Sequence, residues 1–382
     1  MSRSKARSIL FLVAHPADDA SCRYRVQQFI PHLERAGYEC TVSAFSTRTL
    51  HHLLRGKGRI AAKFLHTVYC SARRMLRAAA LRSFDVVVIH REAFPFFTPA
   101  VENWILRRHR NVVFSFDDAI YAGHPDNSAL NHPLLYRLKY GRGVDTVIGR
   151  SRHVIAGNNV LAAYARQFNS SVTVVPTVVD CCQYRPKSPR ALSRDVVTIG
   201  WMGSRSTIPY VGHIETALRR IAEMHHKVEF RFFGYPEYKL DVPNLRSLPF
   251  RMESEVEDLQ SLDIGLMPLP DTEWTRGKCG FKAIQYMAAG VVPVASPVGM
   301  TTELIQDNVN GLLATSVDEW VAALDVLLRD EGLRARLATA ARRTIEESYS
   351  LQVWGPRFVS LIDSLSDAKQ IVECPQAAVL NS

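Results

Sequence analysis

The chain has 382 residues, with 47 Lys and Arg against 37 Asp and Glu and a formal net charge of +10. Chains of this length usually divide into two or more domains, and 47% hydrophobic with 22% charged residues excludes a disordered or fibrous chain. The seven cysteines form no Cys-x-x-Cys pair, which argues against a disulfide framework or a zinc knuckle and predicts a cytoplasmic protein.

The first half alternates short apolar runs with longer amphipathic stretches. The apolar runs are rich in Val and Ile without strict alternation, which is typical of parallel strands buried on both faces. The expected strands are 9–14, 40–44, 86–89, 112–115, 154–156 and 172–175. The expected helices between them are 22–36, 61–80, 99–108 and 159–168.

A polar segment at 181–194 with two prolines is predicted to link two domains, and the strand–helix alternation restarts after it. The expected strands there are 196–199, 228–233, 263–267 and 292–295, and the expected helices are 211–224, 281–289, 317–328 and 332–347. The pattern predicts an α/β protein of two Rossmann-like, doubly wound parallel-sheet domains, 1–185 and 195–348, facing a cleft. A last helix at 349–366, with an apolar stripe through Trp354, is expected to cross back to the first domain.

The loop before the helix at 281–289 is the richest in chemistry. It carries Asp271 and Lys278 and ends at Gly280, and Lys282 follows on the first turn of the helix. A glycine-rich loop that enters a helix offers free backbone N–H groups and the positive end of the helix dipole. With the two lysines, it predicts a cradle for a diphosphate; the alternative is a surface loop with solvated lysines.

The run GFKAIQYMAAGVVPVASPVG at 280–299, followed by Asn310–Gly311, resembles the donor-binding region of retaining GT-B glycosyltransferases of group 1, or family 4. Weaker matches at 28–42, 174–180 and 199–204 extend the resemblance over most of the chain. It implies the GT-B fold and transfer of a sugar, with retention, from a nucleotide sugar to a glycan or lipid-linked acceptor. It also implies that the nucleotide sugar is a substrate and that no cofactor is needed; His, Cys and carboxylate spacing likewise predicts no metal.

The chain departs from this family at two glutamates that usually stand eight positions apart. Their positions are occupied by Gly277 and Gln285. The second glutamate usually holds the ribose hydroxyls, and Gln285 offers only an uncharged carbonyl for that contact. Two alternatives therefore stay open: a GT-B sugar-nucleotide epimerase, and a sugar-nucleotide-binding protein without transferase activity.

The resemblance also implies basic side chains beside the first turn of the second domain. Gly203 and Ser204 form that turn, and Arg205 is the candidate cation for the donor diphosphate. A guanidinium fork suits phosphate oxygens, although an Arg in this position is as compatible with a solvent-facing side chain.

On the other side of the expected cleft, Arg23 and Arg25 follow the first strand and are candidates for the acceptor side. Asp117 and Asp118 follow the expected strand at 112–115, and His90–Glu92 likewise stand at the end of another expected strand. Asp117 is predicted on the acceptor side, and Asp118 is predicted to be catalytic together with Lys282. The alternative role for the aspartate pair is a helix cap or a salt bridge.

Between Cys40 and Phe84 the sequence has nine Lys or Arg and no Asp or Glu. In the expected helix at 61–80, apolar residues alternate with Lys63, Arg73, Arg74 and Arg77. A basic amphipathic helix predicts contact of residues 55–82 with an anionic membrane face, which would place the protein at the inner face of the membrane. The alternative is a helix packed on the sheet. Nucleic acid is not an expected partner, because the segment lacks interleaved aromatic residues and any known module.

Overall fold

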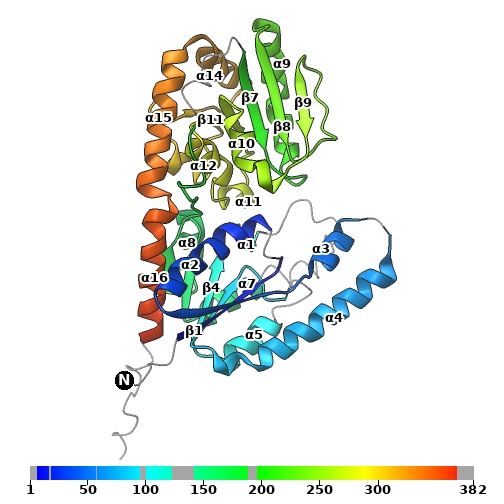
Figure 1. Ribbon diagram of the computed structural model, residues 1–382, viewed down its shortest axis with the longest axis vertical. Helices are drawn as coiled ribbons and strands as arrows, with labels where there is room; N and C mark the ends of the chain where they lie inside the picture. Colours follow the sequence, from blue (N-terminus) through cyan, green and yellow to red (C-terminus); the bar gives the residue numbers. More distant parts are fainter. Residues whose placement is uncertain are drawn as a thin grey trace, which may run out of the picture.

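The computed structural model describes residues 7–16, 19–56, 58–94, 100–122, 142–187 and 196–367. It contains two six-stranded sheets in which neighbouring strands run parallel, and helices pack around both (Figure 1). The prediction of an α/β protein with two Rossmann-like, doubly wound parallel-sheet domains is confirmed.

The first sheet has the strand order β2-β1-β3-β4-β5-β6. Its strands are β1 (Arg7–Val13), β2 (Tyr38–Ala44), β3 (Val86–His90), β4 (Val112–Phe116), β5 (His153–Ala156) and β6 (Val172–Val174). The helices are α1 (Ala20–Arg25), α2 (Ile30–Arg35), α3 (Arg48–Arg55), α4 (Ile60–Ala79), α5 (Ala100–Arg108), α7 (Arg142–Arg150) and α8 (Asn159–Ala165), with 3-10 turns η1 (Gln27–Phe29) and η2 (Leu81–Ser83). The single helix expected at 22–36 is therefore three short pieces.

The second sheet has the order β12-β11-β10-β7-β8-β9. Its strands are β7 (Val197–Met202), β8 (Val228–Phe233), β9 (Leu245–Leu248), β10 (Ile264–Met267), β11 (Val292–Ala295) and β12 (Leu312–Leu313). The helices are α9 (Glu215–Met224), α10 (Glu255–Gln260), α11 (Glu273–Arg276), α12 (Phe281–Ala288), α13 (Thr301–Leu304), α14 (Val317–Arg329) and α15 (Glu331–Ser348), with η5 (Ile208–Ile214) and η6 (Met252–Ser254).

Each sheet has a point where the strand order reverses, which is where doubly wound domains bind ligands. In the first sheet it lies between β1 and β3, and in the second between β7 and β10. The central strands β3 and β4 are buried along their whole length, as their continuous apolar runs predict. Polar side chains that follow these strands are therefore held on a rigid base at the carboxyl edge of the sheet.

The last helix, α16 (Leu351–Asp367), follows α15 and runs along the side of the first domain, as α15 does along the second (Figure 1). Phe358 packs with Phe29 of the first domain, with ring centroids 4.5 Å apart, and Trp354 lies against the same apolar cluster. Asp363 accepts hydrogen bonds from Tyr38 Oη at 2.6 Å and Arg7 Nη1 at 3.0 Å. The end of the chain thus holds the first domain against the α15 side of the second.

Candidate active site

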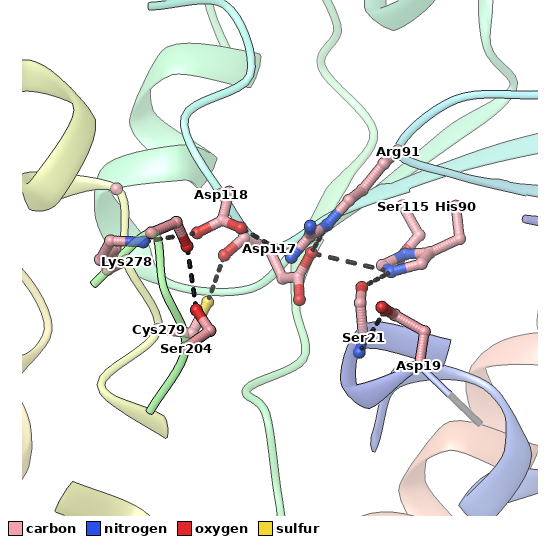
Figure 2. Close-up of polar contacts among 12 residues, drawn as sticks. Asp19, Ser21, His90, Arg91, Ser115, Asp117, Asp118, Ser204, Lys278 and Cys279 are labelled. Carbon is pink, nitrogen blue, oxygen red and sulfur yellow. Dashed lines mark hydrogen bonds and ion pairs between the residues drawn. The ribbon is translucent and has the colours of Figure 1, made fainter. Parts of the chain in front are cut away.

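Two neighbouring strands of the first sheet end in charged residues. His90 closes β3 and Arg91 follows it, while Asp117 and Asp118 follow β4. The two strands are paired with His90 opposite Ser115, so their carboxyl ends bring the four charged side chains together (Figure 2). Arg91 Nε donates to Asp117 Oδ1 at 2.5 Å, and Arg91 Nη2 lies 2.7 Å from Asp118 Oδ2.

Arg91 has a left-handed backbone, with φ of 60°. This conformation costs a residue with a Cβ roughly 1–2 kcal/mol. Its N–H donates to the Ser115 carbonyl at 2.7 Å, and its side chain bridges both aspartates. These charge-assisted hydrogen bonds offset the strain, so the guanidinium is fixed across the ends of two strands.

His90 is buried between the same strands and α1. Its Nε2 lies 2.8 Å from Ser21 Oγ and 3.7 Å from Asp117 Oδ1, and its Nδ1 lies 3.3 Å from Ser115 Oγ. Asp19 caps α1 by accepting from the Ser21 N–H at 3.1 Å, which fixes the serine in place. Burial lowers the pKa of His90 to about 3, so the ring is neutral. Burial alone would raise the pKa of Asp117, but the charge of Arg91 and its hydrogen bond outweigh burial and hold that pKa well below its usual range.

The second domain faces this edge with the loop before α12. Gly280, at φ 64°, begins the helix in a left-handed conformation that favours glycine. The Lys282 ammonium lies over the Trp201 ring, 5.6 Å from its centroid. A Cβ at Gly203 would stand 2.3 Å from Trp201 Cζ2 and 2.7 Å from Lys282 Cε, so the turn passes closely by both side chains. Burial, with the charge of Lys278, lowers the pKa of Lys282 to about 7.

The turn after β7 completes this side. Gly203 N donates to the Phe233 carbonyl at 3.0 Å, and the Ser204 N–H donates to Thr207 Oγ1 at 3.2 Å. The side chains of Ser204 and Arg205 are exposed. The structure therefore brings Gly203 against Lys282, whereas Arg205 contacts none of the described residues through an ion pair.

The loop also touches the first domain directly. Lys278 Nζ lies 3.6 Å from Asp118 Oδ1, and Cys279 Sγ donates to the Asp117 carbonyl at 3.1 Å. The predicted Asp117, Asp118, Lys278, Gly280 and Lys282 thus belong to one region, with the two domains meeting across it.

Gly277 stands where the resembling family has its first glutamate. A Cβ added at Gly277 would lie 2.5 Å from Ala119 Cβ and 3.0 Å from Ala119 N, and the first of these distances is too short for two non-bonded atoms. Asn158, buried at the start of α8, donates to the Gly277 carbonyl at 2.9 Å and accepts from the Leu161 N–H. The missing glutamate is thus replaced by a direct contact between the domains.

Gln285, at the second glutamate position, points into a buried polar network. Its Nε2 donates to Glu255 Oε1 at 2.7 Å and to Tyr184 Oη at 3.1 Å. The same carboxylate accepts from Tyr24 Oη at 3.0 Å and from Arg23 Nη2 at 2.7 Å, both in the first domain. A cavity of about 370 Å³ between the domains is lined in part by Arg23, Tyr184 and Glu255.

The remaining predicted residues are engaged elsewhere. Arg25 is buried and donates to the Val175 carbonyl at 2.7 Å. Asp271 is exposed and forms two hydrogen bonds with Arg276, at 2.5 and 2.8 Å. Within the described part of the chain, neither side chain forms a hydrogen bond with Lys278 or Lys282.

Sequence reasoning left out Arg91, Glu255 and Asn158. Arg91 had a signal, because His90–Glu92 ends a strand next to the one that ends in the aspartates. Glu255 lies on a short helix of six residues with several other acidic residues, and nothing in the pattern separates it from them. Among the residues that the structure describes, no group of three His, Cys, Asp or Glu side chains is placed to hold a metal ion. No helix in those ranges has the length and apolar character to cross a bilayer.

Residues 195–330, within the second domain, match the family model described as "Glycosyl transferases group 1". A 65-residue segment is 42% identical to D-inositol 3-phosphate glycosyltransferase of Xylanimonas cellulosilytica and spans 16% of this chain and 16% of that protein. The fold is similar to sucrose-phosphate synthase of Thermosynechococcus elongatus, with a TM-score of 0.70 at 14% identity over 95% of this chain and 100% of that one.

HepE of Anabaena, solved with UDP and glucose, has a TM-score of 0.67 at 15% identity over 94% of this chain and 100% of that one. WaaG, a glycosyltransferase involved in lipopolysaccharide biosynthesis, has a TM-score of 0.62 at 14% identity over 93% and 99%. At these identities the structural likeness establishes the GT-B fold. The family match adds a sequence likeness to group 1 glycosyl transferases over residues 195–330.

Proposed function

We propose that the chain is a metal-independent, cofactor-independent glycosyltransferase of family 4 type that moves a sugar from a nucleotide-sugar donor to a glycan or lipid-linked acceptor, with retention. The observation that carries the proposal is the position of Lys282. Its ammonium lies beside the Gly203 turn and at the N-terminus of α12, and it forms no hydrogen bond or ion pair within the described residues. A cation and free backbone N–H groups at a helix start suit a diphosphate.

In this proposal the second domain stabilises the leaving group. Lys282 and the first N–H groups of α12 contact the diphosphate, and Lys278 adds a second cation at the same edge. Charge that develops on the leaving phosphate is thereby neutralised by groups that are already in position. The Ser204 hydroxyl, exposed at the turn beside them, contributes a hydrogen bond.

The first domain supplies the acceptor side. Asp118 faces Lys278 at 3.6 Å, so the reacting sugar and acceptor meet near this pair. Retention needs no protein base, because the donor phosphate itself can accept the acceptor's proton. Asp117, held by Arg91, and the neutral His90 with Ser21 would then orient acceptor hydroxyls, which concentrates the reactants in one geometry.

The proposal also covers the finer expectations on partners and place. The protein would be cytoplasmic, and residues 55–82 would contact an anionic membrane face. HepE was solved in complex with UDP-glucose, which makes that nucleotide sugar the first donor to test.

The test is a screen of nucleotide sugars, starting with UDP-glucose, for a rise in melting temperature, because a ligand of the folded state stabilises it by mass action. Turnover with and without acceptor, in the presence of EDTA, follows for any donor that binds. Lys282→Ala should lose both signals, whereas the control Lys227→Ala, an exposed lysine of the same domain, should keep them.

The alternatives give different results in the same assays. An epimerase converts the donor sugar without any acceptor, and a binding protein is stabilised without turnover. Transfer with inversion, seen in the anomeric configuration of the product, would contradict the retaining mechanism. If no nucleotide sugar stabilises the protein, the proposal fails.

A further inference from the structure

Helix α4 has an apolar side that faces away from the protein. Figure 1 shows it at the outer border of the first domain, beside α3 and far from α16. Seven large apolar side chains of this helix are between 42% and 80% exposed: Ile60, Phe64, Leu65, Val68, Tyr69, Met75 and Leu76. They recur at the three- and four-residue spacing that places side chains on one half of a helix.

The side of α4 that faces the protein carries the buried residues Cys70, Arg74 and Ala78. Arg74 is almost fully buried, and its Nη2 donates to the carbonyls of Val13 at 2.8 Å and Ser43 at 2.9 Å. Arg73 Nη2 donates to the Ala44 carbonyl at 2.8 Å. The expectation of a membrane-facing basic surface is therefore wrong for Arg74, which is buried; together with the exposed Arg73 it holds the helix onto the carboxyl ends of β1 and β2. The large apolar side chains of the helix face outward instead.

The charges around the apolar side of α4 indicate which kind of surface it is suited to bind. From Cys40 to Phe84 the chain has no acidic residue. Arg59, Arg77 and Arg82 are exposed along this segment. An apolar face with a basic border is complementary to a lipid surface that has anionic headgroups over acyl chains. A second copy of this chain would instead bring two basic borders together, which like-charge repulsion opposes.

We propose that the outward side of α4, from Ile60 to Leu76, inserts into the boundary between headgroups and acyl chains of an anionic bilayer leaflet. A 20-residue helix is about 30 Å long and would lie flat in that boundary. The inference deepens the proposed membrane contact by assigning it to apolar insertion rather than to the arginines. It rests on the proposed function only for the lipid-linked acceptor, since membrane binding needs no substrate.

Co-sedimentation with vesicles tests the inference, using phosphatidylcholine with and without phosphatidylglycerol. The native protein should bind the mixed vesicles. The triple variant Phe64→Ser/Leu65→Ser/Leu76→Ser should bind them at least ~10-fold more weakly, because three apolar side chains no longer enter the bilayer. A matched control, Met224→Ser/Phe250→Ser/Val309→Ser, removes three exposed apolar side chains of the second domain and should bind like the native protein.

Two further measurements separate the outcomes. Melting temperatures of the native protein and both variants should agree closely, because the substituted side chains are exposed. Equal vesicle binding by the native protein and the α4 variant would overturn the inference. So would a native dimer, seen by light scattering without lipid, that becomes a monomer only in the α4 variant. If vesicles bind and no nucleotide sugar does, the inference stands and the proposed function fails.

Discussion

The charge of Lys282 makes donor binding dependent on pH. Burial, with the neighbouring Lys278, lowers the pKa of Lys282 to about 7 from an ordinary 10.5. A donor diphosphate stabilises the ammonium form and raises that pKa again. Below pH 7 the free protein already carries the proton, so donor affinity should be nearly constant. Above pH 7 the free protein must take up a proton to bind, so affinity should fall as pH rises.

The size of the effect follows from the coupling between proton uptake by Lys282 and donor binding. One proton taken up per donor weakens binding by up to about tenfold per pH unit between the free and bound pKa values. The two phosphates of a nucleotide sugar are diesters and do not titrate in this range, so the slope reports the protein. Lys282→Arg keeps its charge at every pH and should bind donor with a flat profile. Lys282→Ala should bind about 10- to 150-fold more weakly, since a charge-assisted hydrogen bond contributes about 1.5–3 kcal/mol.

Isothermal titration calorimetry between pH 6 and 9 measures this directly, with the nucleotide sugar that most stabilises the protein as titrant. Comparing two buffers of different ionisation heat gives the number of protons taken up. We expect uptake to approach one proton per donor above pH 7 in the native protein and to be absent in Lys282→Arg. The same slope in both proteins would show that another group titrates and would remove Lys282 from the diphosphate site.

Three further predictions concern the frame around the site. Asp117→Asn should lower the free energy of unfolding by about 3 kcal/mol at neutral pH, measured by urea denaturation, because it breaks a buried ion pair. Since the folded pKa of Asp117 is depressed, the difference in unfolding free energy between the native protein and the variant should shrink as pH falls below 4, and a pH-independent difference would contradict the reasoning. Gly277→Glu should lower the melting temperature without raising donor affinity, because its Cβ would stand 2.5 Å from Ala119 Cβ; Gly212→Glu, with open space around it, is the control, and equal melting of both would refute the clash. Phe358→Ala should cost about 3–5 kcal/mol in the same urea assay, and a cost below 1 kcal/mol would show that α16 does not stabilise the first domain.

The fold was predictable because its central strands are buried on both faces. Runs such as 112–115 and 154–156 have no other stable placement than the middle of a parallel sheet, and the structure extends them by only one residue. The two strands that were missed are marginal ones. The edge strand β9 is half exposed and β12 has two residues, so neither carries a long apolar run. Helix α4 was predicted with nearly correct bounds, but which side faces the protein stayed open, because periodicity gives a stripe and not its direction.

The site residues that could be predicted are those that directly follow a strand or begin a helix. Asp117, Asp118 and Lys282 have such positions, and the fold brings the strand ends of the first domain next to the helix start of the second. Arg23 was harder, because its partner Glu255 lies 232 residues further along the chain and pairs with it only when the domains meet. A single sequence gives local pattern, and it contains no signal for which surface charges come together across an interface.

The two missing glutamates have a common structural explanation. At the first position, Gly277 has no space for a side chain beyond a hydrogen, because the Ala119 backbone occupies it. At the second, a glutamate in place of Gln285 would set two carboxylates about one hydrogen bond apart, and one of them would have to be protonated. The amide instead donates to Glu255, which leaves the carboxylate free to accept from Arg23 and Tyr24. Both substitutions therefore strengthen contact between the domains, and the carboxylate nearest to this part of the interface is supplied by α10 rather than α12.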